Sequence, residues 1–150
     1  MPEIARMPPR CVLVLDPAAP RWLIANAAAV LGASAGAAGA AALGPDLTDA
    51  SGGRWAGIAE IVVPVLAAPP AELAALRAAA QDAGVTALAF PDLAQASPTY
   101  ADYAAAIART PTVEIGVHAL ALLGSGNAVR RLTRHLPALT DPDAVPVPVP

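Results

Sequence analysis

Residues 11–16 read CVLVLD, an unbroken apolar run that stops at Asp16 and is followed by Pro17. A short apolar run that is rich in β-branched residues and ends at a turn signal is typical of a strand buried on both faces. We therefore expect this segment to be the first strand of a sheet, and the rest of the fold is worked out from it.

Segments of helical and of strand character alternate after this strand. The alanine-rich stretch after Pro20 predicts a helix, and Leu43 to Ala59 holds too many turn-forming residues for a regular element and predicts a long loop. Pro64 indicates an edge position for the second strand, and Gly84 stands where a helix commonly ends. The remaining expected elements are strands at 61–66, 85–90 and 112–123, and helices at 70–83, 98–107 and 128–136.

This alternation predicts an α/β fold, a three-layer αβα sandwich around a four-stranded, mostly parallel or mixed sheet. We expect residues 1–10 to be a flexible N-terminus and residues 11–139 to form a single domain. Residues 140–150, TDPDAVPVPVP, predict a disordered Pro-rich tail.

Composition excludes several kinds of chemistry. The nine basic residues are all arginine, so Schiff-base catalysis and a phosphate-loop lysine are ruled out. Cys11 is the only cysteine, which excludes an internal disulfide and a Cys-based zinc site. His118 and His135 make no recognisable metal set, and we expect neither a metal nor another cofactor.

The chain carries no pattern that directs it to a membrane. Asp16 interrupts the first apolar run too early for a secretory signal peptide. Residues 23–43 are uncharged, but alanine and glycine dominate them, which favours a water-soluble helix over a membrane span. We therefore expect a cytoplasmic protein with no membrane partner.

Four segments together resemble a small bacterial family known as domain of unknown function number two thousand. They are CVLVLD, WLIANAAAVLG, LGPDLTDASG and ALLGSGNAVRRLTRHLPAL, and they cover most of residues 11–139. That family is grouped by fold with the type II peptidyl-tRNA hydrolases. The resemblance implies a fold like that of these hydrolases, in which a final strand also ends in a glycine turn before a basic helix.

The same resemblance implies an activity, the hydrolysis of the ester that joins a peptide to tRNA. Arg21 corresponds to the basic residues between the first strand and the first helix, Asn26 to a glutamine in that helix, and Asp92 to an aspartate after the third strand. The histidine near that glutamine and the Arg-Thr-Gln after that aspartate have no counterpart here. These three residues are the candidate catalytic group.

Other candidates come from the residues themselves. Asp92 follows an expected strand, where it either orients a water molecule or caps a turn. The turn Gly124, Ser125, Gly126 and Asn127 either offers backbone N–H groups to an anion, or Asn127 is an ordinary helix N-cap. Arg130, Arg131 and Arg134 form one basic face, which binds a tRNA backbone or is simply solvated.

The long loop contains the polar cluster Asp46, Thr48 and Asp49, which we interpret as part of a lid or of a ligand or partner surface. Tyr100 and Tyr103 are interpreted as packing groups.

Three functions remain open. The first is binding of a small ligand or partner by the first helix, Asp92 and the glycine-rich turn. The second is a diverged peptidyl-tRNA hydrolase, with tRNA as partner. The third is a structural homodimer subunit without catalysis, suggested by the apolar excess of 56% hydrophobic against 14% charged residues.

Overall fold

The computed structural model describes residues 9–141, in which the four strands of the main sheet are separated by helices as predicted and further short elements lie between them. Residues 1–8 and 142–150 lie outside the described residues, and with them most of the expected flexible N-terminus and Pro-rich tail. Along the chain the elements are β1 (Pro9–Leu15), α1 (Arg21–Ala37), β2 (Leu47–Thr48), β3 (Arg54–Trp55), β4 (Val65–Ala67), α2 (Pro70–Asp82), β5 (Thr86–Pro91), α3 (Asp92–Ala96), α4 (Tyr100–Arg109), the short 3₁₀ helix η1 (Thr112–Glu114), β6 (Val117–Ser125) and α5 (Gly126–Thr133).

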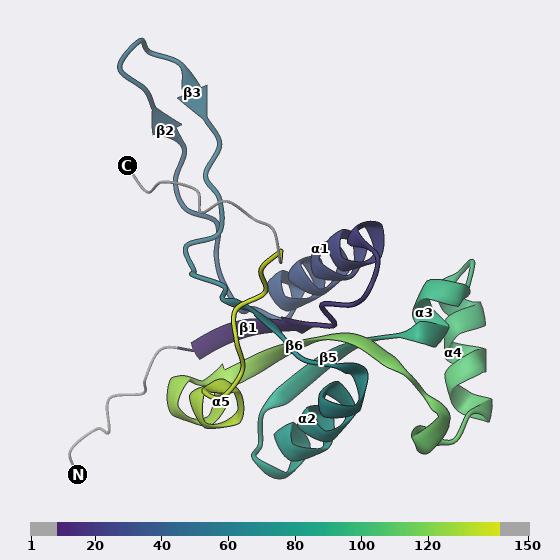
Figure 1. The fold of residues 1–150 in the computed structure, drawn as a ribbon. Helices are drawn as coiled ribbons and strands as arrows, with labels where there is room; N and C mark the ends of the chain where they lie inside the picture. The colour runs from purple at the N-terminus through teal and green to yellow at the C-terminus, as the bar shows by residue number, and fades with distance from the viewer. Residues whose placement is uncertain (1–8, 142–150) are drawn as a thin grey trace.

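Four strands form one mixed sheet in the order β4-β1-β6-β5 (Figure 1). β1 is parallel to β4 and antiparallel to β6, and β6 is also antiparallel to β5. Three strands therefore point the same way, and β6 runs against them between β1 and β5. Of the two sheet types expected, the mixed one is confirmed.

The central place of β6 follows from its residues. Ala119, Leu120, Ala121 and Leu122 are completely buried. A strand with neighbours on both edges and helices over both faces needs apolar side chains at every position, because successive side chains point to opposite faces. The same reasoning explains β1, which is buried from Cys11 to Leu15 and begins two residues earlier than expected, at Pro9.

Helices cover both faces of the sheet, which makes three layers (Figure 1). Alternate residues of β1 and β6 belong to different cores, so each strand contributes to both. Full burial of one leucine or valine side chain contributes about 1.5–3 kcal/mol. The core under α1 includes Leu13, Leu15, Leu23, Ala27, Leu31, Phe90, Ala119 and Ala121, and the core under α2 and α5 includes Val12, Val14, Leu73, Leu76, Leu120, Leu122 and Val129.

Two helix predictions are confirmed. α1 begins at Arg21, directly after Pro20, and continues to Ala37. In α2, Leu73 and Leu76 face the core, and Gly84 follows the helix with a φ of +68°, a backbone conformation that glycine adopts without strain.

Several expected element boundaries were wrong. The predicted second strand shortens to Val65–Ala67 at the sheet edge, where the Pro64 carbonyl accepts a hydrogen bond from the Leu13 N–H (3.0 Å). The helix expected at 98–107 is α4, which starts and ends two residues later than expected, and the Ser97-Pro98 step separates it from α3, a short helix that was not expected. The last strand begins at Val117, since residues 112–114 form η1, and the last helix spans Gly126–Thr133.

The long loop expected between Leu43 and Ala59 was also wrong in part, because it contains a hairpin. Leu47 pairs with Trp55 and Thr48 with Arg54, so β2 and β3 form a small separate sheet. This hairpin and its flanking limbs, residues 43–59, project from the body of the molecule and are called the arm below (Figure 1). Of the helices described, none has both the length and the apolar character needed to cross a bilayer.

Candidate functional site

A cleft of about 390 Å³ opens between α1, β5 and the α3–α4 segment. Its size is within the range usual for small-molecule sites. Among the described residues 9–141, no charged side chain lines it. Its apolar lining includes Val30, Leu31, Leu88 and Phe90, and the hydroxyl-bearing lining consists of Ser34, Ser97, Thr99, Tyr100 and Tyr103.

The two serines of the cleft have already used their hydroxyl hydrogens. Ser34 Oγ donates to the Val30 carbonyl oxygen (2.7 Å), and Ser97 Oγ donates to the Leu93 carbonyl oxygen (2.6 Å). A hydroxyl has one hydrogen and two acceptor lone pairs. Each serine therefore offers the cleft an acceptor and no donor.

Thr99 fixes the α4 side of the cleft. It is the N-cap of α4: its Oγ1 accepts a hydrogen bond from the Asp102 N–H (3.1 Å) and donates to Asp102 Oδ2 (2.7 Å). Such a reciprocal cap satisfies a backbone donor that the first turn of a helix leaves open. The two tyrosines of α4 are thereby held at the mouth of the cleft.

Tyr100 and Tyr103 pack edge to face, with ring centroids 5.6 Å apart and planes at 84°. Burial raises the pKa of Tyr103, the negative charge of ionised Tyr100 raises it further, and the Arg77 guanidinium opposes the shift. Tyr103 is consequently protonated at neutral pH and can donate a hydrogen bond.

Asp92 lies at the carboxyl end of β5, as its first residue after the strand, and starts α3. Its N–H donates to the Gly116 carbonyl oxygen (2.9 Å), and its Oδ1 accepts from the Leu93 N–H (2.8 Å). A Cβ on Gly116 would come within 2.8 Å of Asp92 Oδ2, so a larger residue there would displace this carboxylate. Asp92 does not line the cleft.

Arg21 and Asn26 are both exposed on α1. Arg21 follows the carboxyl end of β1. Because β1 and β5 are both antiparallel to β6, they point the same way, and Arg21 and Asp92 lie at the same end of the sheet. It contacts Asp141 at 4.0 Å. Within residues 9–141, no hydrogen bond or ion pair joins Asp92 to Arg21 or Asn26.

The glycine-rich turn 124–127 lies at the opposite end of the sheet. β6 is antiparallel to β1, so Ser125 pairs with Pro9 at the amino end of that strand. The nine residues of β6 separate this turn from the Asp92 end by roughly 25–30 Å. The structure therefore does not bring the turn, the first helix's amino end and Asp92 into one site.

Ser125, and not Asn127, is the N-cap of α5. Its Oγ accepts a hydrogen bond from the Ala128 N–H (3.3 Å), while the exposed Asn127 lies one residue inside the helix. The expectation of an Asn127 cap was wrong because the helix begins at Gly126, two residues earlier than expected.

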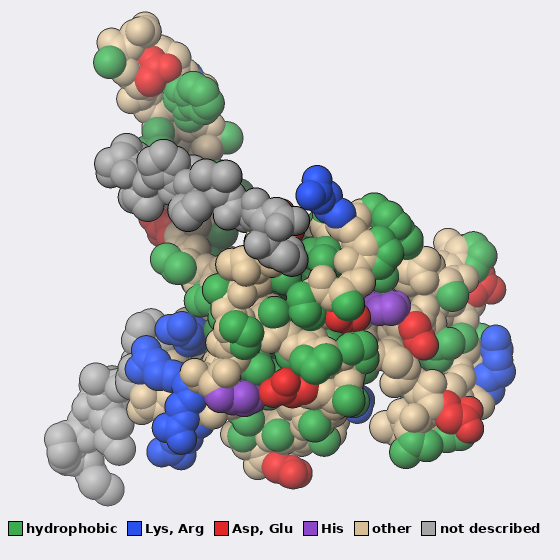
Figure 2. Space-filling model, viewed as in Figure 1, with side chains coloured by type: hydrophobic (Ala, Val, Ile, Leu, Met, Phe, Trp, Pro, Cys, Tyr) green, Lys and Arg blue, Asp and Glu red, His purple; other side chains and the backbone are tan. Residues whose placement is uncertain are grey.

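The predicted basic face is present on α5. Arg130, Arg131 and Arg134 line a hollow of about 250 Å³ together with Asn127. Figure 2 shows arginine side chains gathered over α5. In the described part of the chain none of these three arginines has an acidic partner. The adjacent His135 contacts Glu72 of α2, with its Nε2 2.8 Å from Glu72 Oε1.

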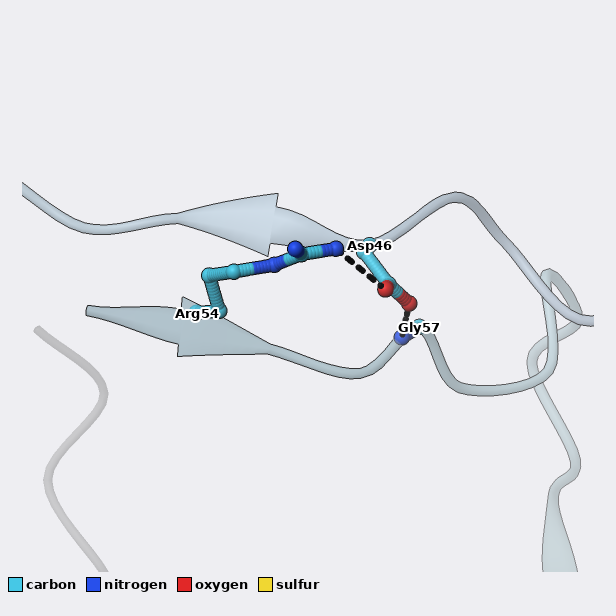
Figure 3. Close-up of polar contacts among 3 residues, drawn as sticks. All are labelled: Asp46, Arg54 and Gly57. Carbon is cyan, nitrogen blue, oxygen red and sulfur yellow. Dashed lines mark hydrogen bonds and ion pairs between the residues drawn. The ribbon is translucent and has the colours of Figure 1, made fainter. Parts of the chain in front are cut away.

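The polar cluster of the expected loop lies on the arm, away from the cleft. Asp46 Oδ2 accepts a hydrogen bond from Arg54 Nη2 (3.4 Å), and Asp46 Oδ1 accepts one from the Gly57 N–H (3.2 Å) (Figure 3). Asp49 closes the turn, and Thr48 pairs with Arg54 across the hairpin. These contacts show that the cluster orders the arm itself. Nowhere in residues 9–141 do three or more metal-ligating His, Cys, Asp or Glu side chains come together.

The family of proteins of unknown function designated DUF2000 matches residues 9–140, which is most of the chain. The chain belongs to the DUF2000 family. The expected membership is thus confirmed. No curated protein matches this chain significantly.

This DUF2000 chain is also similar to the solved structure of a protein of unknown function from Agrobacterium tumefaciens strain C58. The TM-score is 0.77 at 15% identity, and the match covers 88% of this chain and 98% of the other. At this identity the likeness shows a shared fold alone.

The hydroxyl-bearing cleft of this DUF2000 protein was not predicted from the sequence. Tyr100 and Tyr103 were interpreted as packing groups, and Ser34 and Ser97 were not selected at all. A Ser-Pro-Thr-Tyr segment directly after a strand and a short helix was the one signal that could have indicated it, because such a break exposes side chains at the sheet edge.

Proposed function

We propose that this protein binds a small neutral molecule in the cleft between α1, β5 and α4. The observation that carries the proposal is the make-up of the cleft: its lining within residues 9–141 is an apolar floor with hydroxyl groups and without a charged side chain. An ionic ligand would lose its hydration there without a compensating charge, whereas an apolar body gains from burial.

The hydroxyl groups specify the polar part of the ligand. Ser34 and Ser97 are left as acceptors, so they suit an N–H or O–H donor on the ligand. Tyr103 remains protonated at neutral pH and suits a ligand acceptor. An aromatic amine, an amide or an alcohol is neutral at this pH and has this combination.

Binding is favoured over catalysis in this cleft. Acid–base catalysis needs a group that titrates near the working pH. The ionisable lining groups are Tyr100 and Tyr103, and the pKa of Tyr103 is raised away from neutrality. We place the protein in the cytoplasm, where its single thiol, Cys11, stays reduced.

A pair of matched fluorescent probes tests the proposal. N-phenyl-1-naphthylamine is neutral and has one N–H donor, and 8-anilinonaphthalene-1-sulfonate has the same aromatic body with an added sulfonate. We expect the neutral probe to bind at micromolar concentration and the anion to bind at least about tenfold more weakly. Equal binding of both probes, or no binding of the neutral probe, would contradict the proposal.

Two matched variants locate the binding. Val30→Trp fills the cleft from an exposed position on α1, and Val113→Trp adds the same side chain to η1, outside the cleft. We expect Val30→Trp to weaken binding of the neutral probe at least about tenfold, and Val113→Trp to leave it unchanged. Unchanged binding in Val30→Trp, or weaker binding in Val113→Trp, would show that the probe binds outside the cleft and would contradict the proposal.

A second candidate function is hydrolysis of peptidyl-tRNA, with a fold like that of the type II hydrolases. Two placements support it: Arg21 and Asp92 lie at one edge of the sheet, and three arginines without acidic partners within residues 9–141 line the α5 hollow.

The test of the second candidate is release of N-acetylamino acid from N-acetylaminoacyl-tRNA by the purified protein. If this function is correct, turnover falls in Asp92→Ala, and tRNA affinity falls steeply with added salt and in Arg130→Ala/Arg134→Ala. Absence of turnover at high enzyme concentration contradicts it and leaves the ligand-binding proposal untouched.

A further inference from the structure

A second pocket, of about 300 Å³, lies between α2, the end of β5, α4 and the segment that leads from η1 into β6 (Figure 1). We call it the α2–α4 pocket. The cleft lies on the α1 face of β5, with Leu88 and Phe90, whereas this pocket lies on the α2 face. Its volume is at the lower end of the range usual for small-molecule sites, so a ligand that fits it is small.

The lining of the α2–α4 pocket differs from that of the cleft by one charge. Its polar side chains are Arg77 of α2, Tyr103 of α4, Thr110 and Thr112. Within residues 9–141, Arg77 is the one charged side chain that lines it. The rest of the lining is apolar and consists of Ala74, Ala89, Pro91, Ile107, Ile115 and Val117.

Arg77 is half-buried and has no anionic partner within residues 9–141. No hydrogen bond of these residues engages its guanidinium either. Asp92, Asp102 and Glu114 each adjoin a lining residue in the chain, but none of them lines the pocket. A guanidinium offers several N–H donors, and partial removal from water without a partner costs free energy. A bound anion would supply the partner that the described part of the chain does not.

Tyr103 provides a further donor on the α4 side of the pocket. Burial raises the pKa of Tyr103, the charge of ionised Tyr100 raises it further, and the positive charge of Arg77 lowers it, which indicates that the guanidinium lies near the phenol. Tyr103 lines the cleft as well, and its one hydroxyl hydrogen serves one space at a time. Arg77 is therefore the donor that belongs to this pocket alone.

The two threonines of the pocket have different hydrogen-bonding capacity. Thr110 Oγ1 donates to the Ala106 carbonyl oxygen (2.7 Å), so it is left as an acceptor. Thr112 makes no side-chain hydrogen bond within residues 9–141, so its hydroxyl hydrogen is available to a ligand. The polar groups of the pocket thus mainly offer donors, as an anion requires.

We propose that the α2–α4 pocket is a second binding site, which takes a small monocarboxylate with an apolar body. The planar guanidinium of Arg77 matches a carboxylate with two parallel N–H···O bonds. The apolar body then lies against Ile107, Ile115 and Val117, where its burial is favourable.

The charge balance of the pocket favours this class over other anions. One arginine compensates one negative charge, and a dianion such as inorganic phosphate would keep an uncompensated charge in a largely apolar space. An inorganic anion would also leave the apolar lining without a partner. This site is distinct from the cleft, so the inference does not rest on the binding of a neutral molecule there.

Titration of the full, ¹⁵N-labelled chain with matched acids and esters tests the ligand class. The probes are benzoate and hexanoate, each compared with its neutral methyl ester. We expect at least one acid to shift the amide signals of Ile107, Thr112 and Ile115 in a saturable way, with half-saturation below about 5 mM, as befits so small a ligand. Its ester should bind at least about tenfold more weakly. No saturable shift with either acid, or equal binding of acid and ester, overturns the proposal.

Matched arginine substitutions test the assignment to Arg77. Arg77→Gln removes the charge from the pocket, and Arg109→Gln removes one from the exposed last residue of α4, which does not line it. We expect at least about tenfold weaker binding of the acid in Arg77→Gln, a smaller loss in Arg77→Lys, and unchanged binding in Arg109→Gln. Unchanged binding in Arg77→Gln, or an equal loss in both glutamine variants, overturns the proposal. Circular dichroism confirms that each variant is folded.

Exchange of variants between the two sites keeps this proposal separate from the one for the cleft. Val30→Trp fills the cleft and should leave binding of the acid unchanged, because Val30 does not line the α2–α4 pocket. Arg77→Gln should in turn leave binding of N-phenyl-1-naphthylamine unchanged. Loss of acid binding in Val30→Trp would place the carboxylate in the cleft and overturn the assignment of a second site.

Discussion

The central sheet and the arm both contain large apolar side chains, but these are buried in the sheet and exposed on the arm. Leu120 and Leu122 on β6 are completely buried, whereas Leu47 and Trp55 on the arm are mostly exposed. β6 has a strand on each edge and a helical layer over each face, and β2 and β3 have only each other. Hydrophobicity alone therefore does not place a residue in the core. Its burial depends on whether other strands and helices pack around it.

The two regions also differ in what keeps them ordered. The sheet is stabilised by burial of apolar side chains, and its polar groups are mainly backbone groups that pair within it. The arm has no core, and its order comes from Asp46, Asp49 and the backbone bonds between its limbs. An isolated two-stranded hairpin is marginally stable in water, so the arm should be easier to disturb than the sheet.

The largest expected difference is in global stability. Leu120→Ala removes a completely buried side chain and should lower the free energy of unfolding by about 2–5 kcal/mol. Leu47→Ala, measured at concentrations where the protein is monomeric, should change it by less than about 0.5 kcal/mol. Urea denaturation of the two variants measures both values, and similar losses would show that the arm belongs to the core after all.

A smaller effect is expected from Gly57→Ala within the arm. A Cβ at this position would overlap the Gly44 carbonyl oxygen, so the limbs must separate, at a local cost of about 1–3 kcal/mol. The Gly44 N–H to Ile58 carbonyl bond (2.8 Å) should weaken, and the Gly44 amide should exchange its hydrogen at least about tenfold faster.

Gly36→Ala is the control for that substitution. It lies in α1, where an added Cβ meets nothing within 4 Å, so arm exchange should not change. Unaltered exchange at Gly44 in Gly57→Ala would mean that the close approach of the limbs does not hold the arm together.

The smallest expected effect is the response of the arm to acid. The hydrogen bond from the Trp55 indole, followed by those from the Gly53 and Ser51 N–H groups, lowers the pKa of Asp49. Because the folded value is below the unfolded one, the stabilisation is complete above about pH 4 and is lost as pH falls through the folded pKa. Trp55 fluorescence, recorded in a Trp22→Phe background, should therefore change only below about pH 4.

Asp49→Asn provides the comparison, since its amide oxygen accepts hydrogen bonds and does not titrate. The acid transition of Trp55 fluorescence should be absent from this variant. A transition above pH 5, or one that persists in Asp49→Asn, would assign the change to another group.

Much of the fold could be predicted from local sequence. The apolar run at residues 11–15, the alanine-rich segment after Pro20 and the spacing of Leu73 and Leu76 each identify an element by its own periodicity. Prediction failed where a boundary depended on something outside the segment. Residues 112–116 have a strand-like composition, yet Thr112–Glu114 form the 3₁₀ helix η1 before β6 begins. The Gly116 carbonyl oxygen accepts a hydrogen bond from the Asp92 N–H.

The candidate site was less accessible to prediction. Arg21, Asn26 and Asp92 were selected as a group by resemblance, and no hydrogen bond or ion pair joins Asp92 to Arg21 or Asn26 in residues 9–141. The cleft that the structure shows is lined instead by residues from α1, β5 and the α3–α4 segment, among them Ser34 and Tyr103. No pattern within any one of these elements identifies them as neighbours.

The sequence by itself determined most of the helices and sheet strands, that the sheet is apolar on both faces, and which chemistries the lysine and cysteine content excludes. Tertiary structure alone decided that β6 runs antiparallel between β1 and β5, which sends the 124–127 turn and Asp92 to opposite ends of the sheet. It also decided that the arm keeps its apolar face exposed. The physical reason is that periodicity reports which face of an element is apolar, whereas strand direction and burial depend on contacts between residues far apart in the chain.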